Sequence, residues 1–314
     1  MSIGGLHHVT AMAGDPGENV RFFTDALGLR LVKRTVNFDD PGTYHLYYGD
    51  AVGHPGTVMT FFPYADGRQG RAGTGQVTTT AFRIPAGSVD YWLDRFGERG
   101  IDHDEPRERF GATVLPFRDP HGLACELVAV EAHDDDLDPW DGPVPAEHAI
   151  RGFHGVTLTV TGAGPTAEVL TSLGYESGPE ADERRRFRIG DGGPGSVVDL
   201  RVDPDAPRGE MGVGAVHHVA FRTPDDNAQA DLQRRLRDAG HRVTEVKDRQ
   251  YFRSIYFREP GGVLFEIATD PPGFTRDEDR ESLGEALELP PWLEDDREAI
   301  ERNLPPIERE EATR

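Results

Sequence analysis

Cysteine, lysine and long apolar runs are scarce in this chain of 314 residues. Its one cysteine, Cys125, cannot form an internal disulfide, which fits a reducing compartment. No window approaches the roughly 18 apolar residues of a membrane span, and the amino terminus lacks the basic start and apolar run of a signal peptide. We therefore expect a soluble, cytoplasmic protein that does not bind a membrane.

The charge is strongly one-sided. Only Lys33 and Lys247 are lysines among 34 basic residues, and 56 acidic residues bring the formal net charge to −22. This excess argues against a nucleic acid partner, because phosphates would be repelled. Many carboxylates with Arg nearly replacing Lys predict adaptation to a salt-rich cytoplasm, where salt screens self-repulsion. A high-GC coding bias is the alternative explanation for the arginines.

Self-comparison reveals a repeat. Three pairs of segments align, at offsets of 139, 140 and 147 residues: 75–85 with 214–224, 118–127 with 258–267, and 6–10 with 153–157. The chain is therefore predicted to consist of two halves, each containing two similar units.

Each unit opens with a strand followed by a helix. In the first unit Asp15 is the expected N-cap, with Pro16 at the first helical position and Glu18 completing a capping box. The four helices are expected to end before glycines, namely Gly28, Gly100, Gly174 and Gly240. Three strands then follow, in the first unit at residues 30–37, 43–49 and 57–63.

These patterns predict an α+β fold of four βαβββ modules, paired into two cup-shaped mixed β-sheets with flanking helices. The expected organisation is an N-terminal half over residues 1–131, a linker over 132–151, a C-terminal half over 152–274 and an acidic tail over 275–314. The tail carries a short helical pattern at 293–303 and is expected to pack across the body or a partner subunit.

Two histidines and one glutamate lie on the apolar strands of this repeat, His8, His218 and Glu266. Two imidazoles and one carboxylate are the ligands of a non-haem Fe(II) facial triad. A single strand histidine is more often a hydrogen-bonded core residue than a ligand. A glutamate in an apolar strand is harder to explain without a cation, because an unpaired buried carboxylate is costly.

The repeat makes the metal hypothesis specific. At the first-strand ligand position the four units carry His8, Thr79, Gly155 and His218, and only units two and four carry a last-strand glutamate, Glu126 and Glu266. Units one and four together supply the full set, so we predict that they form the metal-bearing cup and that units two and three form a cup without metal. His154 aligns with His7 and is a poor ligand candidate, and Glu126 is expected to pair with an arginine instead.

The βαβββ repeats resemble the vicinal oxygen chelate superfamily, which includes glyoxalases, bleomycin-resistance proteins and extradiol dioxygenases. The segments 5–10, 30–40, 45–50 and 248–257 more closely resemble hydroquinone-type ring-cleaving dioxygenases, and the resemblance extends from about residue 4 to 306. It implies that His8, His218 and Glu266 are the metal ligands. It also implies supporting roles near the metal for His7, Thr10, His217, Arg249 and Tyr256.

The resemblance implies an extradiol-type ring-cleaving dioxygenase that uses Fe(II), with Mn(II) as the alternative, on hydroquinone-like or catechol-like diols and O2. A glyoxalase-like lyase or isomerase is the second interpretation, although its usual fourth ligand has no carboxylate candidate in residues 58–62. A metal-free protein that binds aromatic compounds is the third. Whether the chain is a monomer or a homo-oligomer stays open.

Strand alternation limits which residues can face the metal. His7 and His217 precede the ligands, so either needs a β-bulge or a twisted strand end to reach the site, and outer-face positions are equally compatible. Tyr256 shares the face of Glu266 only if the turn between them has an odd number of residues. Arg249 could hold a developing anion or have a structural role. Alternation also puts at most half of Tyr44, His45, Tyr47 and Tyr48 inside a pocket.

Overall fold

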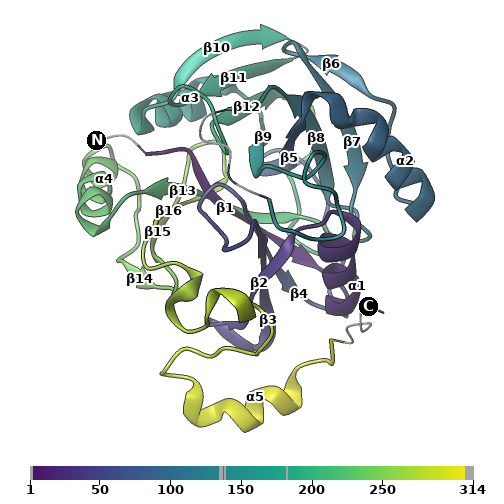
Figure 1. Ribbon diagram of the computed structural model, residues 1–314. Helices are drawn as coiled ribbons and strands as arrows, with labels where there is room; N and C mark the ends of the chain where they lie inside the picture. The colour runs from purple at the N-terminus through teal and green to yellow at the C-terminus, as the bar shows by residue number, and fades with distance from the viewer. Residues whose placement is uncertain (1–2, 134–136, 138, 182, 308–314) are drawn as a thin grey trace.

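The computed structural model describes residues 3–133, 137, 139–181 and 183–307 (Figure 1). The chain is built as four consecutive βαβββ units, as the repeat predicts. Unit one contains β1 (Leu6–Ala13), α1 (Pro16–Arg21), β2 (Arg30–Asn37), β3 (Asp40–Gly49) and β4 (Val58–Pro63). Unit two contains β5 (Gln76–Pro85), α2 (Val89–Arg99), β6 (Arg107–Arg109), β7 (Ala112–Arg118) and β8 (Ala124–Val130). Unit three contains β9 (Phe153–Val160), α3 (Ala163–Leu173), β10 (Glu176–Ala181), β11 (Arg184–Arg188) and β12 (Val197–Val202). Unit four contains β13 (Val216–Thr223), α4 (Asp226–Asp238), β14 (Lys247–Asp248), β15 (Arg253–Arg258) and β16 (Leu264–Thr269).

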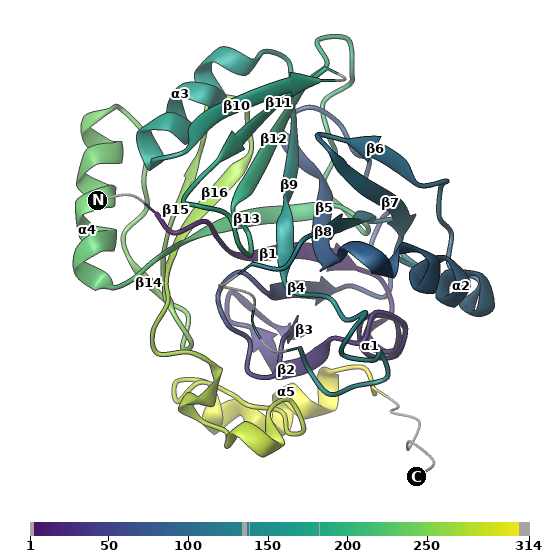
Figure 2. The same cartoon turned by 45° about the horizontal axis from the view of Figure 1, so that its top comes forward.

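The strands form two mixed sheets of eight, and each sheet takes one unit from each half of the chain. The first has the order β14-β15-β16-β13-β1-β4-β3-β2, so it joins unit four to unit one through the antiparallel β1–β13 pair. The second has the order β10-β11-β12-β9-β5-β8-β7-β6 and joins unit three to unit two (Figure 2). This confirms the predicted pairing of units. We call the concave faces of the two sheets the first and second cups.

The principal hydrophobic core packs the helices against the outer faces of both sheets. In unit one, Val20, Phe23 and Leu27 are buried in this core with strand residues such as Phe61. The local signals of the sequence start and stop the first helix as expected. The Asp15 carboxylate accepts a hydrogen bond from the Glu18 amide at 2.7 Å, and a π-helical segment (Phe22–Ala26) extends α1 to the Gly28 turn.

A smaller apolar cluster fills the floor of the first cup, and the C-terminal tail contributes to it. Leu283 of the tail and Phe274, the residue directly before the tail, pack there with Tyr47 of β3 and Tyr251. The side chain of Lys33, on β2, is fully buried and forms ion pairs with Asp277 and Glu278 of the tail. The tail, yellow in Figures 1 and 2, thus packs across the body beside β2 and β3, which is one of the two arrangements expected from the sequence.

Element boundaries agree closely with the expected ones. The strand at 30–37 matches β2, whereas β3 begins three residues earlier than expected because Asp40 already pairs with Asn37 across the turn. The tail pattern folds as a 3-10 turn (Glu294–Asp296) and a helix, α5 (Arg297–Asn303). The acidic run at 134–136 and the end of the tail at 308–314 lie outside the described residues. Within the described residues, no helix has the length and apolar character needed to cross a membrane.

Candidate metal centre

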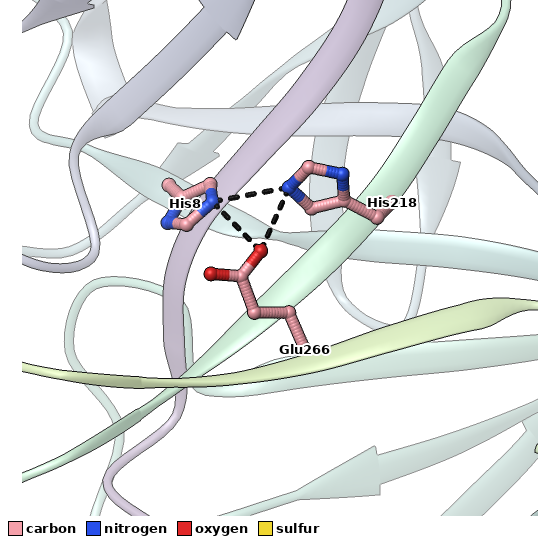
Figure 3. A group of neighbouring side chains, drawn as sticks. All are labelled: His8, His218 and Glu266. Carbon is pink, nitrogen blue, oxygen red and sulfur yellow. Dashed lines mark hydrogen bonds and ion pairs between the residues drawn. The ribbon is translucent and has the colours of Figure 1, made fainter. Parts of the chain in front are cut away.

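Three predicted ligands converge in the first cup (Figure 3). His8 comes from β1, His218 from β13 and Glu266 from β16, three adjacent strands. The Nε2 atoms of the two histidines are 3.2 Å apart, and the Glu266 Oε2 atom is 3.4 Å from that of His8 and 2.9 Å from that of His218. All three residues are buried, so the chain brings together residues 210 and 258 positions apart around one point.

The donor atoms fit a divalent cation better than they fit one another. Two imidazole nitrogens and a carboxylate oxygen all aim at the same small space, and Glu266 Oε2 lacks a hydrogen-bond partner of good geometry among the described residues. Burial alone would raise the pKa of Glu266, but His8 and His218 hold it well below its usual range. An ionised, buried carboxylate beside two imidazoles is a hard-and-borderline ligand set suited to iron or manganese.

Two β-bulges explain how adjacent histidines can act together. In the β1–β13 pairing the register shifts between Leu6 and His8, which makes His7 the extra residue on β1. A second shift makes His217 the extra residue on β13. Because the side chain of a bulged residue departs from strict alternation between the two faces, the His7 ring approaches His8 and the His217 ring approaches His218. The Nδ1 atoms of His7 and His8 are 2.9 Å apart, and those of His217 and His218 are 2.7 Å apart.

These contacts favour the tautomers that a metal requires. The His7 ring donates a hydrogen bond to the backbone of Thr269, which leaves His7 Nδ1 to accept a hydrogen bond from His8 Nδ1. The Nε2 atom of His8 is then unprotonated and can bind a cation. Burial, followed by the charge of His8, lowers the pKa of His7 well below its usual range, which keeps the ring neutral.

His7 and His217 differ in their access to the cavity. His217 lines it, whereas His7 is 2% exposed and contacts His8 and Phe252. Burial and the neighbouring His218 lower the pKa of His217 to about 3, so its ring is neutral at physiological pH. Only His217 of this pair can therefore contact a small molecule in the cavity directly.

The site opens into a cavity of about 530 Å³, a size that suits a small aromatic compound. Tyr256 pairs directly with Glu266 across β15 and β16, so both side chains face the cup. The Arg249 Nε atom donates to the Tyr256 hydroxyl at 3.1 Å, and both residues line the cavity. Burial raises the pKa of Tyr256, which keeps the phenol protonated.

A series of hydrogen bonds between side chains runs along another wall of the cavity. The Tyr47 hydroxyl lies 2.7 Å from His45 Nδ1, and His45 Nε2 lies 2.8 Å from the Thr60 hydroxyl, which is 2.8 Å from that of Thr10. His45 and Tyr47 line the cavity, while Tyr44 and Tyr48 point into the core, as alternation predicts. Thr10, two residues after His8 on β1, therefore joins this network through Thr60.

Some site residues were missed by the sequence interpretation. Ser254 donates a short hydrogen bond to Glu266 Oε1, Phe252 packs against His8, and Thr60 occupies on β4 the place that Glu266 has on β16. Ser254 is two residues before Tyr256 on β15 and shares its face, so the same turn length that left the face of Tyr256 open also hid Ser254. Phe252 lies outside the regular strands, where alternation gives no signal.

The second cup carries a different set at the same positions. Glu126 is buried and forms an ion pair with Arg109, to which Arg107 adds a contact of 3.2 Å. This confirms the expected arginine partner. Gly155 stands where the first cup has His8, and a Cβ atom there would lie 2.2 Å from the Val197 carbonyl oxygen. Among the described residues, His8, His218 and Glu266 form the one cluster with metal-ligand geometry, so neither Glu126 nor His154 belongs to such a group.

Comparison with known proteins agrees with this architecture. The family model described as the Glyoxalase/Bleomycin resistance protein/Dioxygenase superfamily matches residues 5–127 and again 142–267. The Bacillus subtilis protein MhqO, whose name gives it a provisional assignment as a ring-cleaving dioxygenase, is 48% identical over 307 residues, covering 97% of this chain and 96% of its own. The chlorohydroquinone/hydroquinone 1,2-dioxygenase of Sphingobium indicum is 36% identical, covering 96% and 95%.

Solved structures extend the comparison to the fold. A Bacillus subtilis structure, provisionally described as a dioxygenase, superposes with a TM-score of 0.94 at 46% identity and covers 98% of both chains. Glyoxalase I from Zea mays superposes at 0.62 with 16% identity, covering 85% of this chain and 92% of its own, which shows the shared fold alone. With both halves matched and full-length relatives well above 30% identity, the chain belongs to the glyoxalase/bleomycin resistance protein/dioxygenase superfamily.

Proposed function

We propose that this protein is a ring-cleaving dioxygenase that holds a divalent metal, Fe(II) or alternatively Mn(II), with His8, His218 and Glu266. The observation that carries the proposal is the convergence of these three buried donors at the inner end of an aromatic-sized cavity. The names of the full-length relatives support it, since they include ring-cleaving and hydroquinone 1,2-dioxygenases. When bound, such an ion would acidify a phenol and let electrons pass from the ring to O2.

The proposed substrate is a hydroquinone-like or catechol-like diol, cleaved in the extradiol manner, with both oxygen atoms of O2 incorporated. The cavity offers one wall of aromatic side chains, including Phe62 and Tyr47, for the ring. On another wall the neutral His217 can accept or donate one proton at the bound diol, and the protonated Tyr256 can donate a hydrogen bond. Arg249 can stabilise negative charge that develops near Tyr256. His7 orients His8, and Thr10 acts through its hydrogen bond to Thr60, so neither is proposed to touch the substrate ring.

The glyoxalase-like alternative is less well supported by the residues present. A fourth protein ligand would have to come from the position on β4 that mirrors Glu266, and that position holds Thr60, already bonded to Thr10 and His45. Three protein ligands would leave positions on a bound ion for the diol and O2.

The test is oxygen consumption by protein that has been loaded with Fe(II) under anaerobic conditions. With hydroquinone or catechol, we expect uptake of one O2 per ring cleaved and the appearance of two labelled oxygen atoms in the product from ¹⁸O2. Product formation from a glyoxal–thiol adduct without oxygen uptake would instead support the lyase. Tight binding of the diol with no turnover under any metal loading would support the binding protein. Cytoplasmic location, adaptation to salt and the oligomeric state stay predictions of the sequence.

A further inference from the structure

The turn between β2 and β3 lies at the mouth of the first cup. Asn37, Phe38 and Asp39 of this turn line the cavity. β2 and β14 are the two edge strands of the first sheet, at opposite ends of an order of eight. Because the sheet curls into a cup, its two edges approach each other here, and side chains from both edges meet over the site.

Asp39 makes the contacts between these edges. Its carboxylate lies 2.9 Å from Arg249 Nη2 and 3.8 Å from Lys247 Nζ, both at the β14 edge. Burial alone would raise the pKa of Asp39, but its hydrogen bond to Arg249 lowers it, so the carboxylate stays ionised. The sequence has only two lysines, and both tie unit one to a distant segment: Lys247 to Asp39, and Lys33 to the tail.

The same arginine reaches the candidate site. Arg249 donates from Nε to Tyr256, while its Nη2 is held by Asp39. The Arg249 side chain is 18% exposed, whereas that of Asp39 is 60% exposed. An arginine side chain is long and flexible, so a partner on the outer side of its guanidinium limits the positions from which Arg249 can contact Tyr256. Without the carboxylate, two neighbouring cations would repel each other at the mouth.

The hydrophobic side of the turn is supported from outside. Phe38 lines the cavity on one side and packs edge-to-face against Trp292 of the tail, with ring centroids 5.6 Å apart. The tail also lies along β2, where the Glu288 amide donates to the Arg34 carbonyl at 2.9 Å. The tail therefore supports Phe38 from outside, whereas the contact of the turn with the far edge depends on Asp39.

We propose that Asp39 is a latch that joins the two edges of the first sheet over the candidate site and a positioning residue that holds Arg249 against Tyr256. Closed, the latch narrows the mouth and keeps Arg249 facing the cavity. Because Asp39 is largely exposed, salt screens the pair and opens the latch. The latch is a property of the fold alone, and the positioning role rests on the proposed function.

Hydrogen exchange tests the latch without any need for activity. In Asp39→Asn, the backbone amides of residues 36–40 and 42 should exchange several-fold faster than in the wild type. High salt should speed their exchange in the wild type and have little further effect in the variant. The matched control is Asp226→Asn, which removes an exposed Asp–Arg pair of 2.5 Å between Asp226 and Arg253, neither of which lines the cavity. Equal exchange in wild type and Asp39→Asn would overturn the latch.

Kinetics of the metal-loaded enzyme tests the positioning role. Asp39→Asn should lower kcat/KM for the diol by about tenfold, because a displaced Arg249 no longer orients Tyr256. Asp39→Glu, which keeps the charge, should restore part of the loss, and the thermal midpoint should change little in either variant. An unchanged kcat/KM, or an equal loss in Asp39→Glu and Asp39→Asn, would refute positioning. Absence of turnover in the wild type would refute the proposed function, while the exchange comparison would still decide the latch.

Discussion

The two cups share one backbone design but use it differently. In both sheets the central strand pair carries two bulges at equivalent places, His7 and His217 in the first and His154 and Thr78 in the second. The bulges therefore occur in both sheets and do not depend on the metal-ligand residues of the first cup. The difference comes from the side chains at the candidate ligand positions, where His8 is matched by Gly155 and His218 by Thr79.

The two cups also differ in the charged groups around their buried glutamates, Glu266 in the first cup and Glu126 in the second. The pKa values of Glu266 and Glu126 are both lowered despite burial, the first by two histidines and the second by Arg109. A histidine pair is neutral when it binds metal, so Glu266 fits a divalent cation as its partner. A guanidinium is permanently charged and occupies the corresponding space in the second cup. The equivalent glutamates of the two cups thus differ in their partners, which are two histidines for Glu266 and an arginine for Glu126.

The largest expected effect is on metal binding. Glu266→Ala should abolish tight Fe(II) binding, because losses of outer-shell partners alone cost roughly 10- to 100-fold and this change removes a ligand. Glu126→Ala should leave metal content unchanged. The measurement is metal analysis of both variants after anaerobic reconstitution and desalting, with circular dichroism to verify folding. Equal metal loss in the two variants would contradict the assignment of the site to the first cup.

Substitutions in the second cup should instead change the free energy of unfolding. Glu126→Ala leaves Arg109 buried without its main partner, so we expect a loss of about 3–5 kcal/mol in the free energy of unfolding. The double variant Glu126→Leu/Arg109→Met should recover much of that loss, since apolar groups of similar volume remove both charges. Urea denaturation of the metal-free proteins measures both values. A double variant as unstable as the single one would show that the pair is not the source of the loss.

Gly155 tests why unit three cannot supply a ligand. A Cβ atom at this position would meet the Val197 carbonyl at 2.2 Å, so the backbones of β9 and β12 would have to move apart. We expect Gly155→Ala to cost about 1–3 kcal/mol, as overpacking does elsewhere. Gly87→Ala is the control, because its Cβ would have no neighbour within 4 Å. Equal thermal stability in both variants would mean that the ligand was lost for another reason.

The fold and the clustering of His8, His218 and Glu266 could be predicted because the repeat supplied independent copies of one pattern. Turn and cap residues such as Asp15 and Gly28 act locally, so the sequence places helices and strands to within a few residues. Absence of a ligand from two of the four first-strand positions then predicted which units pair, and the sheet order confirms that pairing.

Other features depend on relations that alternation cannot encode. The bulge at His217 changes its facing by one inserted residue, and no residue type in the sequence marks a bulge there. The face of Tyr256 depended on a turn length that only the register with Glu266 resolves. Asp39 lies 210 residues from Arg249, in a turn whose position follows from the curl of the whole sheet.

The smallest expected effect is a change in the free energy of unfolding at acidic pH. The folded-state pKa of Glu126 is below its unfolded value of about 4.3, so its ionised form is favoured by folding. The contribution is therefore complete above the unfolded pKa and is lost as the pH falls through the folded pKa. The stability gap between wild type and Glu126→Gln should stay constant from neutral pH to about pH 5, then narrow by up to 1.4 kcal/mol for each pH unit below it. Urea denaturation across this range measures the gap, and subtraction removes the groups common to both proteins. A gap that widens in acid would mean that Arg109 does not favour the ionised carboxylate, and the contrast drawn between the two cups would fail.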